Sequence, residues 1–177
     1  MKAIIPVAGA GNKLRAHTYT QPKALIPLAG KTILSIIIDQ LAEAGVKDFI
    51  LVVGYLGDKI MDYAKAKYPD LNITIIYQNE RKGLGHAIHL CKEVVGEDEV
   101  LIALGDTICE FNVESLLQST GSVLCVKKVD DPRDFGVAET GTLVLNSNSE
   151  ETRLSTMLCE THVAILKESN ENFKPDT

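Results

Sequence analysis

A cluster of glycines and basic side chains near the start of the chain has the composition of an anion-binding loop. An apolar run at residues 3–7 is followed by the turn AGAG at residues 8–11, and Lys13, Arg15 and Lys23 come soon after it. Glycine lets backbone N–H groups approach a ligand closely because it carries no side chain. With positive charges beside those amides, the loop is predicted to bind a flexible polyanion, most simply a triphosphate.

The distribution of charge along the chain favours the same interpretation. The formal net charge is −6, which argues against nucleic acid as the main partner. The basic residues that precede the first acidic residue, Asp39, are Lys2, Lys13, Arg15, Lys23 and Lys31. An acidic protein with an entirely basic opening segment is expected to use that segment on an anion. Chance clustering on a solvated face is the alternative.

Two widespread phosphate-binding motifs are excluded by single positions. A Rossmann fingerprint would need its third glycine where Leu14 stands, and no helical pattern begins there. A Walker loop ending in the GKT of residues 30–32 would need a glycine at the position of Leu25. Thr32 is instead predicted to cap a helix.

Strands and helices are predicted to alternate along the chain. Apolar runs predict strands at residues 3–7, 49–53, 73–77, 100–104 and 122–128, with a later one within 158–167, and helical patterns occupy residues 32–44, 58–68, 83–95 and 113–118. Such alternation implies an α/β fold with parallel pairing and right-handed crossovers. The uninterrupted apolar run at residues 49–53 is expected to be buried on both faces.

The order of these elements predicts where a ligand would bind. In parallel sheets ligands lie at the carboxyl ends of the strands, so the loops after Val7, Val53, Tyr77 and Leu104 should share one rim. Asp106 comes directly after the last of these strands. A carboxylate in that place suits Mg²⁺, a hard ion that favours oxygen ligands and bridges phosphates. A turn or helix cap is the alternative role for Asp106.

A string of motifs resembles the signature of the sugar-1-phosphate nucleotidyltransferases, which are nucleoside-diphosphate-sugar pyrophosphorylases. The matching segments are GAGNKL at residues 9–14, Thr18, PKALIP at 22–27, LGD at 104–106 and DPRDFGVAE at 131–139. The resemblance is continuous from Met1 to about Glu139. Within the family, the chain looks like the glucose-1-phosphate thymidylyl- and uridylyltransferases.

This resemblance implies a fold and a reaction. The fold would be a three-layer α/β/α Rossmann-like nucleotidyltransferase fold with a mostly parallel central sheet. The reaction would transfer a nucleotidyl group from UTP or dTTP to a sugar 1-phosphate, with Mg²⁺ as cofactor. Its products would be an NDP-sugar and pyrophosphate, which makes the expected role one in NDP-sugar biosynthesis.

The resemblance also implies roles for particular residues. Lys13 would hold the leaving β- and γ-phosphates, Lys23 would bridge the attacking and α-phosphates, and Asp106 would hold Mg²⁺ beside the sugar phosphate. Gly136 would meet the sugar hydroxyls. The residues expected to bind the nucleotide are Ala8, Gly9, Gly11, Gln78 and Gly83. Gln78 would read the pyrimidine edge, because its amide offers both a donor and an acceptor; a surface glutamine in a charged loop is the alternative.

The resemblance divides the chain into two parts. Residues 1–139 would form the nucleotidyltransferase core, and residues 140–177 a divergent or truncated C-terminal segment. In that segment the family's E-K-P motif and second metal-binding aspartate are not found, and Lys13 stands where the family usually has arginine. A second hypothesis therefore stays open: a catalytically weak or inactive relative that binds nucleotide or a partner subunit.

The remaining features predict a cytoplasmic protein with small-molecule partners. The apolar runs are too short to span a bilayer, and four scattered cysteines without a C-x-x-C motif suit free thiols in a reducing compartment. His86 and His89 have no third ligand near in sequence, so a metal site is not expected there. The expected partners are an NTP and a sugar 1-phosphate, without nucleic acid or membrane. Homo-oligomerisation, the sugar and the choice between uridine and thymidine stay open.

Overall fold

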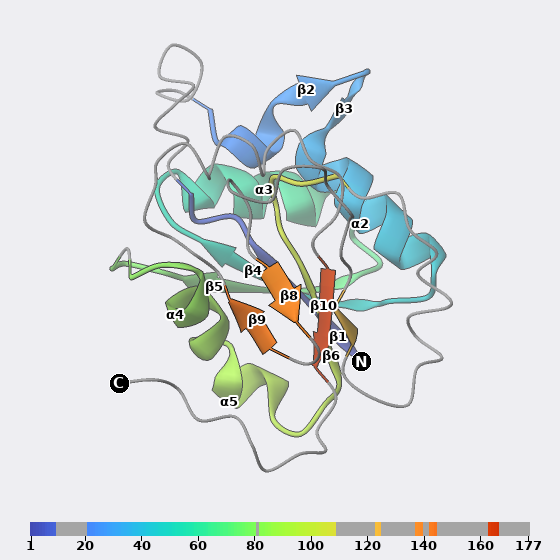
Figure 1. Ribbon diagram of the computed structural model, residues 1–177. Helices are drawn as coiled ribbons and strands as arrows, with labels where there is room; N and C mark the ends of the chain where they lie inside the picture. Colours follow the sequence, from blue (N-terminus) through green and yellow to red (C-terminus); the bar gives the residue numbers. More distant parts are fainter. Residues whose placement is uncertain are drawn as a thin grey trace.

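A six-stranded sheet forms the centre of the protein (Figure 1). The structure is a computed structural model that describes residues 1–9, 21–80, 82–108, 123–124, 137–139, 142–144 and 163–166. The strands of the sheet, in spatial order, are β5 (Asn72–Tyr77), β4 (Asp48–Val53), β1 (Lys2–Pro6), β6 (Val100–Ala103), β10 (Val163–Leu166) and β7 (Val123–Leu124).

Parallel pairing dominates this sheet. β1 lies between β4 and β6 and is parallel to both, and β5 is parallel to β4. β10 runs antiparallel to both β6 and β7. The predicted α/β architecture with a mostly parallel sheet is therefore confirmed. The strand predicted within residues 158–167 is present as β10, whose place inside the sheet no local pattern indicated; the domain boundary after residue 139 stays a prediction.

Helices cover both faces of the sheet (Figure 1). They are α2 (Ile33–Glu43) and α3 (Gly57–Lys67) on one face, and α4 (Leu84–His89) and α5 (Lys92–Val95) on the other. Alternate side chains of a strand point to opposite faces. Thus Ala3 and Ile5 of β1 pack in the core cluster of α2 and α3, whereas Ile4 packs with Ala87 and Cys91 on the other side. Three layers result, as the resemblance implied.

Strand β4 is the most completely enclosed part of the core. Each residue from Phe49 to Val53 is at most 1% exposed. Burial on both faces was predicted from the uninterrupted apolar run, and it follows from the coverage of the sheet by helices on each side.

Two smaller β pairs and one short helix complete the described elements. They are the hairpin of β2 (Pro27–Leu28) and β3 (Lys31–Thr32), the pair of β8 (Val137–Glu139) and β9 (Thr142–Val144), and the 3-10 helix η2 (Lys23–Leu25). Over the described ranges, no helix combines the length and apolar character needed to cross a membrane.

The ends of α2 are set by the residues that the sequence singled out. Thr32 Oγ1 accepts a hydrogen bond from Ser35 N at 3.1 Å, which satisfies one of the free N–H groups of the first turn. Gly45 takes a φ of +94° just beyond the last turn, a conformation that favours glycine. Both predicted helix ends are confirmed.

The prediction of a single helix at residues 83–95 is wrong in one respect, because the structure has two helices there, α4 and α5. At the division Cys91 N–H binds the carbonyl of Ile88, three residues back, at 3.0 Å. This tighter turn goes with a fully buried Cys91 side chain. The helix predicted at residues 113–118 lies outside the described residues, and of the strand predicted at 122–128 only β7 is described.

Cys91 is a free thiol, as the scattered cysteine pattern predicted. Burial raises the pKa of Cys91 to about 11, so the thiol stays protonated and unreactive near neutral pH. The other three cysteines lie outside the described residues.

Candidate functional site

The carboxyl ends of four parallel strands lie side by side. Beyond the ends of the strands, Val7 N donates to Val52 O at 2.8 Å, Gln78 N to Val53 O at 2.8 Å, and Gly105 N to Pro6 O at 3.2 Å. These bonds extend the ladder of β5, β4, β1 and β6 into the loops that follow. The predicted sharing of one rim by these loops is confirmed, and this edge of the sheet is called the carboxyl rim below.

Small residues allow the loops of the carboxyl rim to approach closely. A Cβ atom on Gly105 would lie 2.2 Å from Val7 Cγ1 and 2.7 Å from Pro6 O, and one on Gly54 would lie 2.9 Å from Ala8 O. Only glycine fits at these two positions without displacing the end of β1. Ala8 is thereby held against the loop after β4, and Gly105 places the following Asp106 beside β1.

Lys23 and Asp106 meet at this rim. The Lys23 Nζ atom donates to Asp106 Oδ2 at 2.7 Å, across 83 positions of sequence. Lys23 begins η2, where the buried residues Ala24 and Leu25 anchor the backbone and Gln21 Nε2 donates to Leu25 O at 2.7 Å. The Lys23 side chain is 12% exposed and the Asp106 side chain 45%. The ammonium is therefore largely enclosed, while the carboxylate remains open to a ligand.

Asp106 offers one exposed carboxylate, which could hold Mg²⁺ only together with other ligands. Mg²⁺ takes one or two carboxylates and completes its shell with water and substrate phosphates. Among the residues that the structure describes, no group of three or more His, Cys, Asp or Glu side chains could hold a metal ion by itself. A cation bound here would thus depend on phosphate oxygens in addition to Asp106.

Gln78 forms a second polar cluster at the same rim, just after β5. Its side chain is buried, with the residue 8% exposed. The Nε2 atom donates to Gly83 O at 3.0 Å and lies 3.1 Å from His86 Nδ1. Gly83 has a φ of +89°, which only glycine adopts readily. Gln78 and Gly83 are thus brought together at the start of α4.

Sequence reasoning missed the place of His86 in this cluster. The sequence raised it only as a metal ligand paired with His89. A usable signal was present, because His86 lies three residues after Gly83, one helical turn into the predicted helix, where it can face the loop that precedes it.

The structure describes some of the predicted site residues and not others. The described ones, all at or next to the carboxyl rim, are Lys23, the first residue of η2, and the loop residues Ala8, Gly9, Gln78, Gly83 and Asp106. Gly9 is exposed, with open space around the position of a Cβ. Lys13, Gly11 and Gly136 lie outside the described residues. The roles assigned to all these residues stay predictions.

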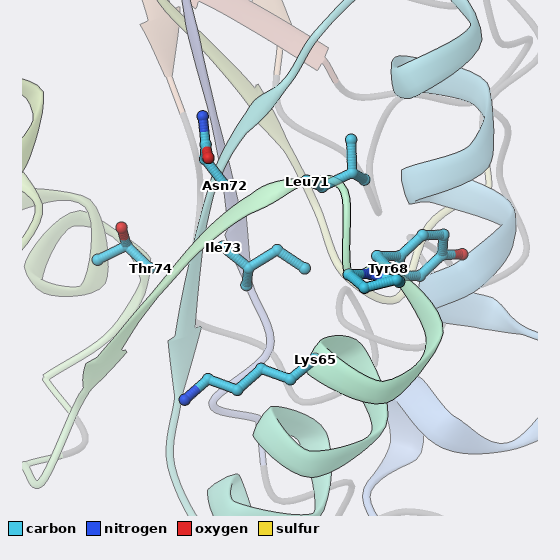
Figure 2. A pocket seen from close by; sticks show the side chains of 7 residues that line it. Lys65, Tyr68, Leu71, Asn72, Ile73 and Thr74 are labelled. Carbon is cyan, nitrogen blue, oxygen red and sulfur yellow. The ribbon is translucent and has the colours of Figure 1, made fainter.

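A separate pocket opens at the opposite end of the sheet (Figure 2). It is lined by Lys65, Tyr68, Pro69, Leu71, Asn72, Ile73 and Thr74, between the end of α3 and the start of β5. It contains no predicted site residue. Figure 2 shows the Tyr68 hydroxyl directed away from the strand towards α2, where it lies 2.6 Å from Asp39 Oδ1. Burial raises the pKa of Tyr68, and the Asp39 carboxylate adds to the rise, so this hydroxyl remains a structural donor.

Comparison with known proteins agrees with the order of motifs in the chain. The family model described as nucleotidyl transferase matches residues 2–156. The glycan biosynthesis nucleotidyltransferase Agl11 of Haloferax volcanii is 32% identical, over 78% of this chain and 41% of that protein. The bifunctional protein GlmU of Methanocaldococcus jannaschii is 41% identical, over 77% of this chain and 32% of that protein.

A further relative carries a more specific name. The UTP–glucose-1-phosphate uridylyltransferase of Staphylococcus epidermidis is 32% identical, over 78% of this chain and 59% of that protein. The chain therefore spans less than two thirds of the length of each of these three relatives.

Two solved structures share the fold. A Bacillus anthracis protein assigned as a glucose-1-phosphate thymidylyltransferase, in complex with sucrose, has a TM-score of 0.77 and 22% identity, over 94% of this chain and 71% of that chain. A UDP-glucose pyrophosphorylase complexed with UDP-glucose has a TM-score of 0.72 and 21% identity, over 94% of this chain and 75% of that chain. They confirm the predicted Rossmann-like fold.

Proposed function

The chain belongs to the nucleotidyltransferase family, and we propose that it transfers a nucleotidyl group from UTP or dTTP to a sugar 1-phosphate. The products are an NDP-sugar and pyrophosphate. The observation that carries this proposal is the pairing of Lys23 with Asp106 at the carboxyl rim. An ammonium that could bind phosphate and a carboxylate that could hold a metal ion therefore lie together at the edge where parallel sheets bind their ligands.

The proposed reaction is an in-line displacement at the α-phosphorus. A phosphate oxygen of the sugar 1-phosphate forms the new bond, and the bond from the α-phosphorus to the α–β bridging oxygen breaks, so that pyrophosphate leaves with the electron pair. The protein supplies little covalent chemistry to such a reaction. It supplies orientation and neutralisation of the charge that develops.

Lys23 and Asp106 would each exchange one partner for another during the reaction. With no substrate bound they neutralise each other at 2.7 Å. With the nucleotide bound, the Lys23 ammonium would bridge the attacking and α-phosphates, and the Asp106 carboxylate would hold Mg²⁺. Bound Mg²⁺ supplies positive charge to the phosphate oxygens. Because Lys23 is already positioned by η2, little reorganisation precedes its contact with phosphate.

The other predicted residues would complete the site. Lys13 holds the β- and γ-phosphates, the amides of Gly9 and Gly11 line the nucleotide, and Gly136 meets the sugar. Gln78 reads the base. The names of the uridylyltransferase relative and of the UDP-glucose complex support a uracil-type base and a glucose-type sugar.

A second function is that of a chain that binds nucleotide at the carboxyl rim without transferring it. The enclosed Lys23 ammonium and the exposed Asp106 carboxylate would serve nucleotide binding whether or not transfer follows. Turnover distinguishes the two functions.

The test is release of pyrophosphate by the purified chain with glucose 1-phosphate, Mg²⁺ and either UTP or dTTP. We expect release that requires all three components and stops when EDTA removes the metal. Calorimetric titration with the same nucleotides runs beside it. Binding without turnover would support the second function, and the absence of both binding and turnover would contradict both.

A further inference from the structure

The amide of Gln78 is held in one orientation by the carbonyl of Gly83. A carbonyl oxygen can only accept a hydrogen bond, so the amide atom 3.0 Å from it must be the NH₂ group. The opposite rotamer would set two oxygen atoms against each other. Since the Gln78 side chain is buried, the amide cannot turn to water without leaving its place.

His86 receives the second hydrogen of the same NH₂ group. Its Nδ1 atom lies 3.1 Å from Gln78 Nε2. An amide N–H faces this ring nitrogen, so Nδ1 must carry the lone pair and the ring proton must be on Nε2. Gly83 and His86 therefore oppose rotation of the amide together, one from the loop and one from α4.

The helix that carries His86 is firmly seated. Ala87, the next residue, is 2% exposed, and Cys91 is fully buried against the sheet. His86 itself is half-buried. Its ring is thus positioned by an element packed on the core, whereas Gln78 lies in the loop that follows β5.

These two contacts determine which atom of the Gln78 amide can still bind a ligand. Within the described part of the chain, the side-chain contacts of Gln78 all run through Nε2, and no buried side-chain nitrogen or oxygen there is without a partner. The Oε1 atom therefore remains accessible as an acceptor. The sequence suggested that Gln78 offers both a donor and an acceptor to a base, but the geometry leaves it the acceptor alone.

We propose that His86 is a positioning residue that holds the Gln78 amide with Oε1 towards the ligand, so that the site selects pyrimidine bases whose N3 atom carries a hydrogen. This inference rests on the proposed function, in which Gln78 reads the base. Uracil and thymine carry a hydrogen on N3, whereas N3 of cytosine is an acceptor. A site whose acceptor faces N3 disfavours a base that has only a lone pair at that atom.

The test compares UTP with CTP in wild type and in a set of variants. His86→Leu removes the acceptor, and one amide N–H of a buried side chain then has no partner, so the amide should swing away. His86→Asn retains an acceptor oxygen near the place of Nδ1. His89→Leu, on the exposed face of the same helix, is the matched control, and Gln78→Ala marks the full loss of base reading.

The expected result is a change in discrimination with little change in turnover. His86→Leu should reduce the preference for UTP over CTP roughly tenfold, chiefly by raising KM for UTP, with kcat within about twofold of wild type. In His86→Asn, KM and kcat for UTP should each stay within about twofold of wild type. In His89→Leu, both values should equal those of wild type. Undiminished preference in His86→Leu, or equal losses in His86→Leu and His86→Asn, would overturn the inference.

An NMR measurement keeps the inference separate from the proposed function. The long-range ¹H–¹⁵N spectrum of wild-type protein should show His86 with its proton on Nε2. A proton on Nδ1 would overturn the inference whatever the protein binds. Because the spectrum is recorded on wild-type protein, it tests the inference even if His86→Leu does not fold. Wild-type protein that neither binds nor uses UTP or dTTP would overturn the proposed function and this role together. A normal wild-type reaction with unaffected His86 variants would overturn this inference alone.

Discussion

The two ends of strand β5 differ in how their polar groups are used. At its carboxyl end, no residue that the structure describes donates to Gln78 Oε1, and the neighbouring loops bring Lys23 to Asp106, whose side chain is 45% exposed. At its amino end lies the pocket of Figure 2, where Asn72 donates to Asp48 at 3.0 Å and Tyr68 is bound to Asp39. In this open pocket the side chains of Asn72 and Tyr68 therefore tie secondary-structure elements together. The candidate site is therefore identified by the meeting of polar groups of different types at the carboxyl rim, and not by the presence of a pocket.

The largest expected effect comes from comparing the replacement of one lysine at each end of β5. Lys23→Ala should lower kcat for pyrophosphate release by about 10²–10³, because one preorganised phosphate contact is lost. Lys65→Ala, in the pocket at the amino end, should leave kcat unchanged. A rate that survives Lys23→Ala would remove Lys23 from the mechanism, and equal losses in both variants would contradict the distinction between the two ends.

The next effect concerns the close packing of the carboxyl rim. Gly105→Ala should lower the free energy of unfolding by about 1–3 kcal/mol, since its Cβ would lie 2.2 Å from Val7 Cγ1. Gly85→Ala is the matched control: the space around Gly85 is open and it lies inside α4, so alanine should raise stability by about 0.5–1 kcal/mol. Chemical denaturation measures both. A neutral Gly105→Ala would show that the end of β1 can move.

The smallest effect tests the amino end. Tyr68→Phe should lower the free energy of unfolding by about 1–2 kcal/mol, because the hydroxyl that lies 2.6 Å from Asp39 Oδ1 is lost, and kcat should not change. In Tyr77→Phe, which removes a hydroxyl donated to Asp58 at an exposed site, the change should be smaller. If Tyr68→Phe impaired turnover with its stability intact, the amino end would have to be included in the functional site.

Much of the fold could be predicted because its signals are local. The apolar run of β4, the cap at Thr32 and the stop at Gly45 each depend on a few neighbouring residues. The rim could be predicted as well, because parallel strands joined by helices must end on the same edge. The division between α4 and α5 could not, because it goes with burial of Cys91 against a sheet that the local sequence does not contain.

The candidate site, too, could be predicted from the sequence only in part. The family resemblance, together with the residue types, predicted a phosphate contact for Lys23, a metal contact for Asp106 and a base contact for Gln78. Their mutual arrangement depends on contacts between distant segments. The direction of β10 is a similar case, because four apolar residues form a strand equally well in either sense and the partner strands decide which.

Local sequence determined most of the strands and helices, both ends of α2, and which side chains could do chemistry, because propensity, capping and side-chain type act over a few residues. Only the tertiary structure decided that Lys23 reaches Asp106 across 83 positions and that Gln78 is left with one acceptor by Gly83 and His86. Hydrogen bonds depend on distance and direction, and these are set when the sheet, its glycines and its covering helices pack together.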